Sequence, residues 1–328
     1  MWIKGFTYGW KAVRGAYRTE RAIASQDKLF DLGINWMCLA FYVEQKSFAS
    51  TEIYYDYRKT ITDKDISFAI KRAHERGIKV CLKPVINSAD NMWRALIDFP
   101  DGDMLGQDRY WGAWFEYYTA FLCHYAELAE DTGCEMLCVG CEMSGTERKE
   151  TYWRELIQKV RAIYSGPIVY NTNHGREEMV PWFDAVDYIG TSAYYRIGKV
   201  PKDTMEHMLQ AWSKVGEGLE RISDKYGKQI IFMEIGCRSA EGCATMPWDF
   251  AHRELPWDEE EQAAFYDSCL MAFRDKKWFA GAFWWDWSTE VYSTREEAMK
   301  DRGFDIHLKK AETVIKRWYQ QADTDDMC

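Results

Sequence analysis

MLCVGCEM, residues 136–143, and QIIFMEIG, residues 229–236, follow one pattern: an apolar run closes on a single carboxylate, Glu142 in the first and Glu234 in the second. An ionised carboxylate is costly to bury unless it is paired or used in chemistry. Continuous apolar runs of this length are typical of strands in a parallel sheet that is covered on both faces. The two stretches therefore predict a buried parallel sheet that carries two acids at its strand ends.

Strand-like runs alternate with amphipathic helical patterns along the whole chain. Eight such runs begin at residues 5, 34, 78, 136, 167, 188, 229 and 280, and helical patterns include 63–76, 110–131, 150–164, 204–226 and 258–275. Eight βα units in 328 residues, with no G-x-G-x-x-G turn after the first strand, favour a closed (β/α)8 TIM barrel over an open doubly wound sheet. We predict one α/β domain over residues 1–320 and a frayed tail at 321–328.

The composition excludes several classes of function. The formal net charge of −10 argues against a nucleic-acid partner, because phosphate binding needs clustered Lys and Arg. No apolar run approaches the roughly 18 residues of a membrane-spanning helix, so we expect no membrane partner. The N-terminus, MWIKGFTYGW, lacks the pattern of an export signal, and the ten cysteines fall mostly inside predicted elements. These features predict a cytoplasmic protein with reduced thiols.

The carboxyl ends of barrel strands converge on one mouth, where active sites of this fold lie. The residues at these ends are Lys83, Asn87, Glu142, Asn171, Asn173, Tyr194, Tyr195, Glu234, Trp285 and Asp286. Glutamates after the fourth and seventh strands form the pair that a retaining glycosidase uses, one as acid/base and one as nucleophile, with carboxyl groups about 5 to 5.5 Å apart. The alternative is that both acids only make ion pairs within the barrel.

The neighbours of the two acids also have two interpretations each. Trp285 can stack under a sugar ring or pack inside the barrel. Tyr194 or Tyr195 can donate a hydrogen bond to the nucleophile, but alternation lets only one of them point inward. We expect Lys83 to face the ligand, because an unpaired ammonium inside an apolar strand is costly.

The amides at the mouth, Asn87, Asn171 and Asn173, can bind sugar hydroxyls or cap turns.

The cysteine and histidine spacings argue against a metal site. Cys134, Cys138 and Cys141 have the C-x3-C-x2-C spacing that holds an iron–sulfur cluster in radical enzymes. An extended strand separates the first and last of them by on the order of 20 Å, too far to ligate one cluster. The six histidines include no H-E-x-x-H and no close pair. We therefore expect neither a metal nor a cofactor.

The segments KVCLKPVIN, NMWRALI, CVGCEM, YWRELI, YIGTSAYY, IIFMEIGCRSA and GAFWWDW, in this order, resemble glycoside hydrolase family 113, the β-mannanase-type family of the clan A barrels. The resemblance covers nearly the whole chain. It implies that Glu142 is the acid/base and that Glu234 is the nucleophile. It further implies that the sugar-binding cleft is lined by Lys83, Trp93, Arg94, Asn173, Tyr194 and Trp285.

The chain departs from the wider clan at one position. The clan commonly has an Asn before the acid/base, where it bonds the sugar 2-hydroxyl, and this chain has Cys141. A thiol is a weak donor. Either another side chain, such as Asn87 or Asn173, therefore takes the role, or the 2-hydroxyl is recognised differently.

We therefore expect a retaining glycoside hydrolase that cleaves β-1,4-linked mannosides, either as an endo-mannanase or as an exo-acting mannosidase. Because a polymer does not enter a cytoplasm, short manno-oligosaccharides are the expected substrate. The manno preference comes from the resemblance alone. The alternatives are a retaining β-glycosidase of different sugar specificity and a non-catalytic carbohydrate-binding barrel. The sequence does not indicate the oligomeric state.

Overall fold

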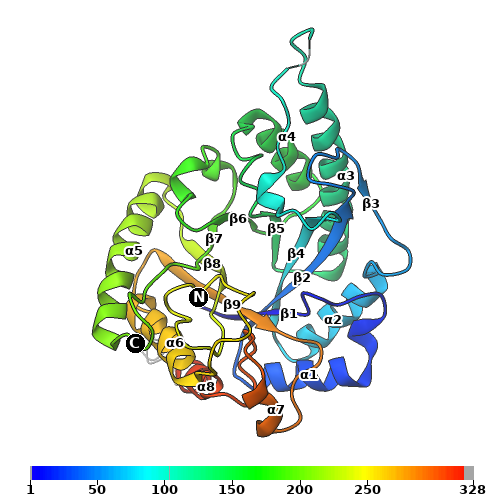
Figure 1. The fold of residues 1–328 in the computed structure, drawn as a ribbon. Helices are drawn as coiled ribbons and strands as arrows, with labels where there is room; N and C mark the ends of the chain where they lie inside the picture. The colour runs from blue at the N-terminus through cyan, green and yellow to red at the C-terminus, as the bar shows by residue number, and fades with distance from the viewer. Residues whose placement is uncertain (1, 103, 321–328) are drawn as a thin grey trace, which may run out of the picture.

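The chain folds as a closed barrel, which confirms the predicted (β/α)8 architecture. The computed structural model describes residues 2–102 and 104–320, and the tail predicted at 321–328 lies outside them. Within these residues the strands form one sheet in the order β1-β9-β8-β7-β6-β5-β4-β2-β3, and β1 also pairs with β2 to close it. Helices surround the strands (Figure 1).

The eight barrel strands run parallel to their neighbours, and the short β3 is an antiparallel addition at the edge of β2. Their bounds are β1 (Ile3–Tyr8), β2 (Trp36–Gln45), β3 (Ile53–Tyr54), β4 (Lys79–Ser88), β5 (Met136–Cys141), β6 (Ile168–Asn173), β7 (Tyr188–Ser192), β8 (Ile230–Ile235) and β9 (Phe279–Trp287). Nearly every barrel-strand residue is buried, because side chains fill the barrel inside and helices cover it outside. This double burial explains the continuous apolar runs in the sequence.

The helices are α1 (Glu20–Phe30), α2 (Asp63–Glu75), α3 (Arg109–Thr132), α4 (Glu150–Arg161), α5 (Met205–Tyr226), α6 (Glu259–Phe273), α7 (Arg295–Lys300) and α8 (Lys310–Gln320). Each of the five helical patterns named from the sequence is an α-helix here, with small shifts at the ends. Two of these helices lead into the strands that carry the acids. Gly133 after α3 and Gly227 after α5 take left-handed backbone angles, φ 69° and 63°, which end the helices and turn the chain toward β5 and β8.

One βα unit differs from the regular repeat that the sequence predicted. Between β6 and β7 the chain makes only two short 3-10 helices, η3 (Glu177–Met179) and η4 (Phe183–Ala185). Aromatic packing covers the barrel here in place of an α-helix: the rings of Trp182 and Trp153 stack with centroids 4.6 Å apart, and the indole of Trp182 donates to the carbonyl of Glu147 at 3.0 Å.

No helix among residues 2–102 and 104–320 is long and apolar enough to cross a membrane.

Candidate active site

The two predicted acids both lie at the mouth of the barrel. Glu234 is the next-to-last residue of β8, and Glu142 directly follows β5. The backbone N–H of Glu142 donates to the carbonyl of Asn171 on β6 at 2.7 Å, which fixes the start of its loop against the sheet. Glu142 and Glu234 expose only 9% and 4% of their surface. Two nearly buried carboxyls therefore share one end of the barrel.

Glu142 has a left-handed backbone, with φ 55°. This conformation is unfavourable for a residue with a Cβ, and it persists where the surrounding structure imposes it, often at active sites. The local sequence is otherwise a plain strand ending, so the turn is imposed by the fold.

Three groups donate to the carboxylate of Glu234. Lys83 Nζ lies 2.6 Å from Oε1, the Tyr194 hydroxyl lies 3.2 Å from Oε2, and Cys141 Sγ lies 3.2 Å from Oε1. Burial alone would raise the pKa of Glu234, but the positive charges of Lys83 and Arg94 outweigh it and lower that pKa below its ordinary value. Glu234 is therefore held as an anion in a fixed orientation.

The carboxylate of Glu142 has looser partners. Trp93 Nε1 lies 3.3 Å from its Oε2, and Arg94 Nη2 lies 3.7 Å from the same oxygen. The guanidinium of Arg94 also bonds Asn87 Oδ1 at 3.2 Å and lies over the ring of Trp10. Trp93 and Arg94 both belong to the loop after β4, so this loop supplies the surroundings of the second acid.

The structure shows which of the two adjacent tyrosines, Tyr194 or Tyr195, donates a hydrogen bond to Glu234. Tyr194 points to Glu234, whereas the hydroxyl of Tyr195 donates to the buried carboxylate of Glu177. Burial raises the pKa of Tyr194, and the nearby negative charge of Glu234 raises it further, so its hydroxyl keeps the proton that it donates.

The predicted amides occupy different positions around the acids. Asn171 Nδ2 lies 3.3 Å from Cys141 Sγ and 3.3 Å from Ser192 Oγ, so this amide is bound within the barrel wall. Asn173 Nδ2 donates to Ser144 Oγ at 2.9 Å, two residues beyond Glu142.

Trp285, at the end of β9, is only partly buried, whereas its neighbours Trp284 and Trp287 are fully buried. Its ring contacts Trp10, with centroids 5.3 Å apart, and Trp10 in turn contacts Tyr42 at 5.5 Å. Of the three tryptophans in this strand, Trp285 is therefore the one that reaches the open end of the barrel.

Asp286, which follows Trp285, is a further acid at this rim. Desolvation at its partly buried position raises the pKa of Asp286 to about 7, and the negative charge of Asp305 contributes in the same direction.

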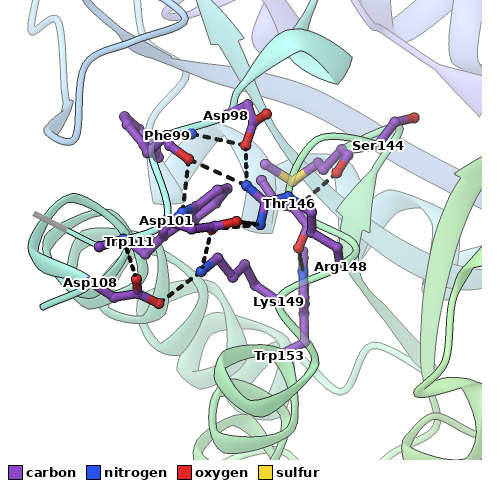
Figure 2. A network of polar contacts seen from close by, with 12 residues as sticks. Asp98, Phe99, Asp101, Asp108, Trp111, Ser144, Thr146, Arg148, Lys149 and Trp153 are labelled. Carbon is purple, nitrogen blue, oxygen red and sulfur yellow. Dashed lines mark hydrogen bonds and ion pairs between the residues drawn. The ribbon is translucent and has the colours of Figure 1, made fainter. Parts of the chain in front are cut away.

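A polar network joins acids of the loop after β4 to the segment that follows Glu142 (Figure 2). Arg148 bonds Asp98 at 2.8 Å and Asp101 at 2.6 Å, and Lys149 bonds both Asp101 and Asp108 at 2.8 Å. The guanidinium of Arg148 also lies 5.1 Å from the ring centroid of Trp111. The segment after Glu142 is thereby tied to the loop after β4, the loop that also carries Trp93 and Arg94.

Some residues of this end of the barrel were not found from the sequence. Ser144 and Ser192 bond the predicted amides, Trp10 contacts Trp285, and His174 stacks on Trp248 with ring centroids 5.7 Å apart. The only available signal was position: each lies in a strand end or in the loop that follows one, where a barrel builds its site.

The described residues contain no group of three or more His, Cys, Asp or Glu side chains placed to hold a metal ion. The nine cysteines among them are all free thiols.

Comparison with known proteins identifies the family. A model described as Glycoside Hydrolase Family 113 matches residues 6–309. The solved structure of a family 113 β-mannanase from Alicyclobacillus acidocaldarius, in complex with ManMIm, is 38% identical over 97% of each chain, with a TM-score of 0.88. A family 113 β-1,4-mannanase, solved as a complex, is 36% identical over 98% of this chain and 99% of that one, also with a TM-score of 0.88.

A β-glucuronidase from Faecalibacterium prausnitzii shares only the fold, with 13% identity, a TM-score of 0.64, and coverage of 99% of this chain and 49% of its own. A search of curated protein sequences gave no significant match. The family model and the two family 113 structures agree over nearly the whole length, and the chain accordingly belongs to glycoside hydrolase family 113, as a homologue of its β-1,4-mannanases.

Proposed function

We propose that this enzyme hydrolyses β-1,4-linked mannosides with retention, with Glu234 as nucleophile and Glu142 as acid/base. The observation that carries the proposal is the difference between the two acids. Glu234 is paired with Lys83 at 2.6 Å and kept ionised, as a nucleophile must be. Glu142 has longer contacts, 3.3 Å to Trp93 and 3.7 Å to Arg94, as suits the acid/base of the cycle.

The first step forms a covalent intermediate. A carboxylate oxygen of Glu234 attacks the anomeric carbon, the bond to the leaving oxygen breaks, and the proton of Glu142 passes to that oxygen. In the second step Glu142, now a carboxylate, takes a proton from water. The water oxygen attacks the anomeric carbon from the face that the leaving group occupied and displaces Glu234, so the configuration is retained.

The other predicted residues have supporting roles in this proposal. Lys83 and Tyr194 hold the nucleophile through direct contacts, and Trp285 is the floor under the sugar at the cleavage site. Asn87, Trp93, Arg94 and Asn173 line the cleft around Glu142. A separation of about 5 to 5.5 Å between the two carboxyl groups remains the expectation for retention.

The sugar and its length complete the proposal. The two family 113 structures are described as a β-mannanase and a β-1,4-mannanase, which favours a mannoside as the substrate of this chain. The loop after β4 brings Trp93 to Glu142, and the long loop after β8 follows Glu234 directly. Two long loops beside the acids suit a cleft that is closed on one side, which would favour short manno-oligosaccharides cut from a chain end. The free thiols accord with a reducing, cytoplasmic setting, which stays a prediction.

A screen of aryl β-glycosides of several sugars tests the activity. We expect turnover, with the mannoside fastest. Absence of turnover with every sugar would favour the non-catalytic binding barrel, and a faster reaction with another sugar would assign a different specificity.

Time-resolved product analysis on mannohexaose and on polymeric mannan tests the substrate length. We expect mono- or disaccharides to appear first from the hexasaccharide. Early mixed fragments of middle length, or a rapid fall in the viscosity of the polymer, would show internal cleavage and contradict the chain-end proposal.

A further inference from the structure

The loop after β8, residues 236–257, presents an aromatic surface that the mechanism above does not use. Trp248 in this loop exposes 44% of its surface, although a tryptophan of a folded protein is usually well buried. Its other face stacks on His174, with ring centroids 5.7 Å apart and planes 21° from parallel. An indole supported from behind and open in front is suited to stack against the apolar face of a pyranose ring.

His174 connects this surface to the acid/base. It directly follows Asn173, whose side chain donates to Ser144, two residues after Glu142. The backbone of Glu142 is itself bonded to β6, the strand that ends at Asn173. Trp248 therefore stacks on a residue of the segment next to Glu142.

The chemistry of the reaction assigns a side of the cleft to this position. An acid/base must touch the oxygen that leaves, so the leaving sugar lies beside Glu142. The sugar that is attacked lies instead over Glu234, where Trp285 is the proposed floor. We propose that Trp248, supported by His174, forms a binding subsite for the leaving saccharide. This inference rests on the proposed function and deepens it.

The loop is rigid enough to act as a preformed platform. Arg238 and Asp249 form a nearly buried ion pair, and Arg238 Nη1 also donates to the carbonyl of His252 at 2.6 Å. Asp249 Oδ1 accepts the backbone N–H of Ala251 at 2.9 Å. These contacts tie down the chain both before Trp248, at Arg238, and after it, at Asp249 and His252. A ring that is already ordered loses little entropy when it binds a ligand, so its contact area is available for affinity.

The charge state of His174 suits a supporting ring. Burial lowers the pKa of His174, although the nearby carboxylates of Glu177 and Glu142 act in the opposite direction. The imidazole is therefore neutral at neutral pH, and it packs against the indole without a charge that would have to be desolvated when a sugar covers the pair.

The test compares two substrates that fill the side of the attacked sugar equally. Mannotetraose has a saccharide leaving group, whereas β-mannobiosyl fluoride has a leaving group of one atom that cannot reach Trp248. We expect Trp248→Ala to lower kcat/KM for mannotetraose by about 10- to 100-fold, and to change kcat/KM for the fluoride by less than about twofold. Trp248→Phe keeps an aromatic face and should recover most of the lost activity.

Phe250→Ala is the matched control, because Phe250 exposes 76% of its surface on the same loop. We expect wild-type rates with both substrates. An equal loss of both substrates in Trp248→Ala, or an equal loss with mannotetraose in Phe250→Ala, would overturn the subsite while leaving the hydrolase proposal intact. A wild-type enzyme that cleaves neither substrate would overturn the proposed function, and this inference with it.

Discussion

The two halves of the site hold their acids differently. Glu234 lies within a strand, and Lys83, Cys141 and Tyr194 all lie within 3.2 Å of its carboxylate. Glu142 lies just beyond a strand on a left-handed backbone, and the donors Trp93 and Arg94 lie 3.3 and 3.7 Å from its carboxylate. The contacts of Glu234 therefore fix both its charge and its orientation, whereas the carboxyl of Glu142 is bound only loosely.

The difference matches what each acid must do in a retaining cycle. A nucleophile stays ionised until it forms its bond, so a close cation helps it throughout the approach. An acid/base must be protonated in one step and ionised in the next, and a tight ion pair would hinder the first of these states. Substitutions on each side test this asymmetry, from the largest expected effect to the smallest.

Glu234→Gln is expected to have the largest effect. An amide cannot form the glycosyl ester, and the other contacts of the site offer no replacement, so turnover should fall by about 10⁴-fold or more with every substrate. Steady-state rates with an aryl β-mannoside and with mannotetraose measure this. Circular dichroism should show an unchanged fold. Residual activity above one per cent in a contamination-free preparation would contradict the assignment.

Glu142→Gln should separate the substrates. Oligosaccharides need a proton on the departing oxygen, so their rate should fall by about 10²- to 10⁴-fold. Aryl glycosides with good leaving groups need no acid, so formation of the intermediate should be nearly spared and visible as a burst of phenol. If a folded variant lost both substrate types equally, the roles of the two acids would be wrongly assigned.

Lys83→Met should act through Glu234. Without the cation 2.6 Å away, burial dominates and the pKa of Glu234 rises. A protonated carboxyl cannot attack, so the acid limb of the profile of kcat/KM against pH should move to higher pH, and the rate at its optimum should fall by about 100-fold. Lys79→Met, at the opposite end of the same strand, is the control. An unmoved acid limb would show that Lys83 serves the substrate alone.

The sequence predicted the two acids because each ends an apolar run, and a strand-end acid in a barrel can only face the mouth or make an ion pair. The same reasoning placed Tyr194 or Tyr195 at the mouth, but the choice between them depends on where β7 ends, at Ser192, which no pattern marks. Trp248 and His174 come from loops without periodicity. Whether these two rings stack depends on the path of the loop after β8. An ion pair between Arg238 and Asp249, eleven positions apart, sets that path.

The missing helix between β6 and β7 has a similar cause. The repeat predicts a helix after every strand, but the covering of this side is decided by the contact of Trp182 with Trp153, which lie far apart in the sequence. Likewise the left-handed backbone of Glu142 has no local signal in the sequence, because glutamate, unlike glycine, does not favour this conformation.

Trp285→Ala should weaken the binding of the sugar at the cleavage site by about 2 kcal/mol, or roughly 30-fold, the order expected for losing a large aromatic contact. The measurement is the inhibition constant of a mannose-type inhibitor that fills this position. Tyr57→Ala, which removes an 80% exposed ring elsewhere, should leave it unchanged. An unaltered constant for Trp285→Ala would return this ring to barrel packing.

The smallest effect is expected at Cys141, which lies between the surroundings of Glu234 and those of Glu142. Cys141 Sγ contacts Glu234 Oε1 at 3.2 Å and lies 3.9 Å from Arg94 Nη2, whose guanidinium also approaches Glu142. Burial raises the pKa of Cys141 well above its ordinary value, so the group is a thiol that donates weakly to the nucleophile.

Cys141→Ser replaces this donor by a slightly smaller and stronger one, and Lys83 remains the main partner of Glu234. We therefore expect kcat/KM to change by less than about threefold. For the same reason the native enzyme should resist iodoacetamide, because the reactive thiolate is not formed and the side chain is only 1% exposed. Rapid alkylation at Cys141 with loss of activity would show that a thiolate lies beside Glu234. Lys83 would then have two anions to neutralise, and its ion pair with Glu234 would not by itself explain why Glu234 stays ionised.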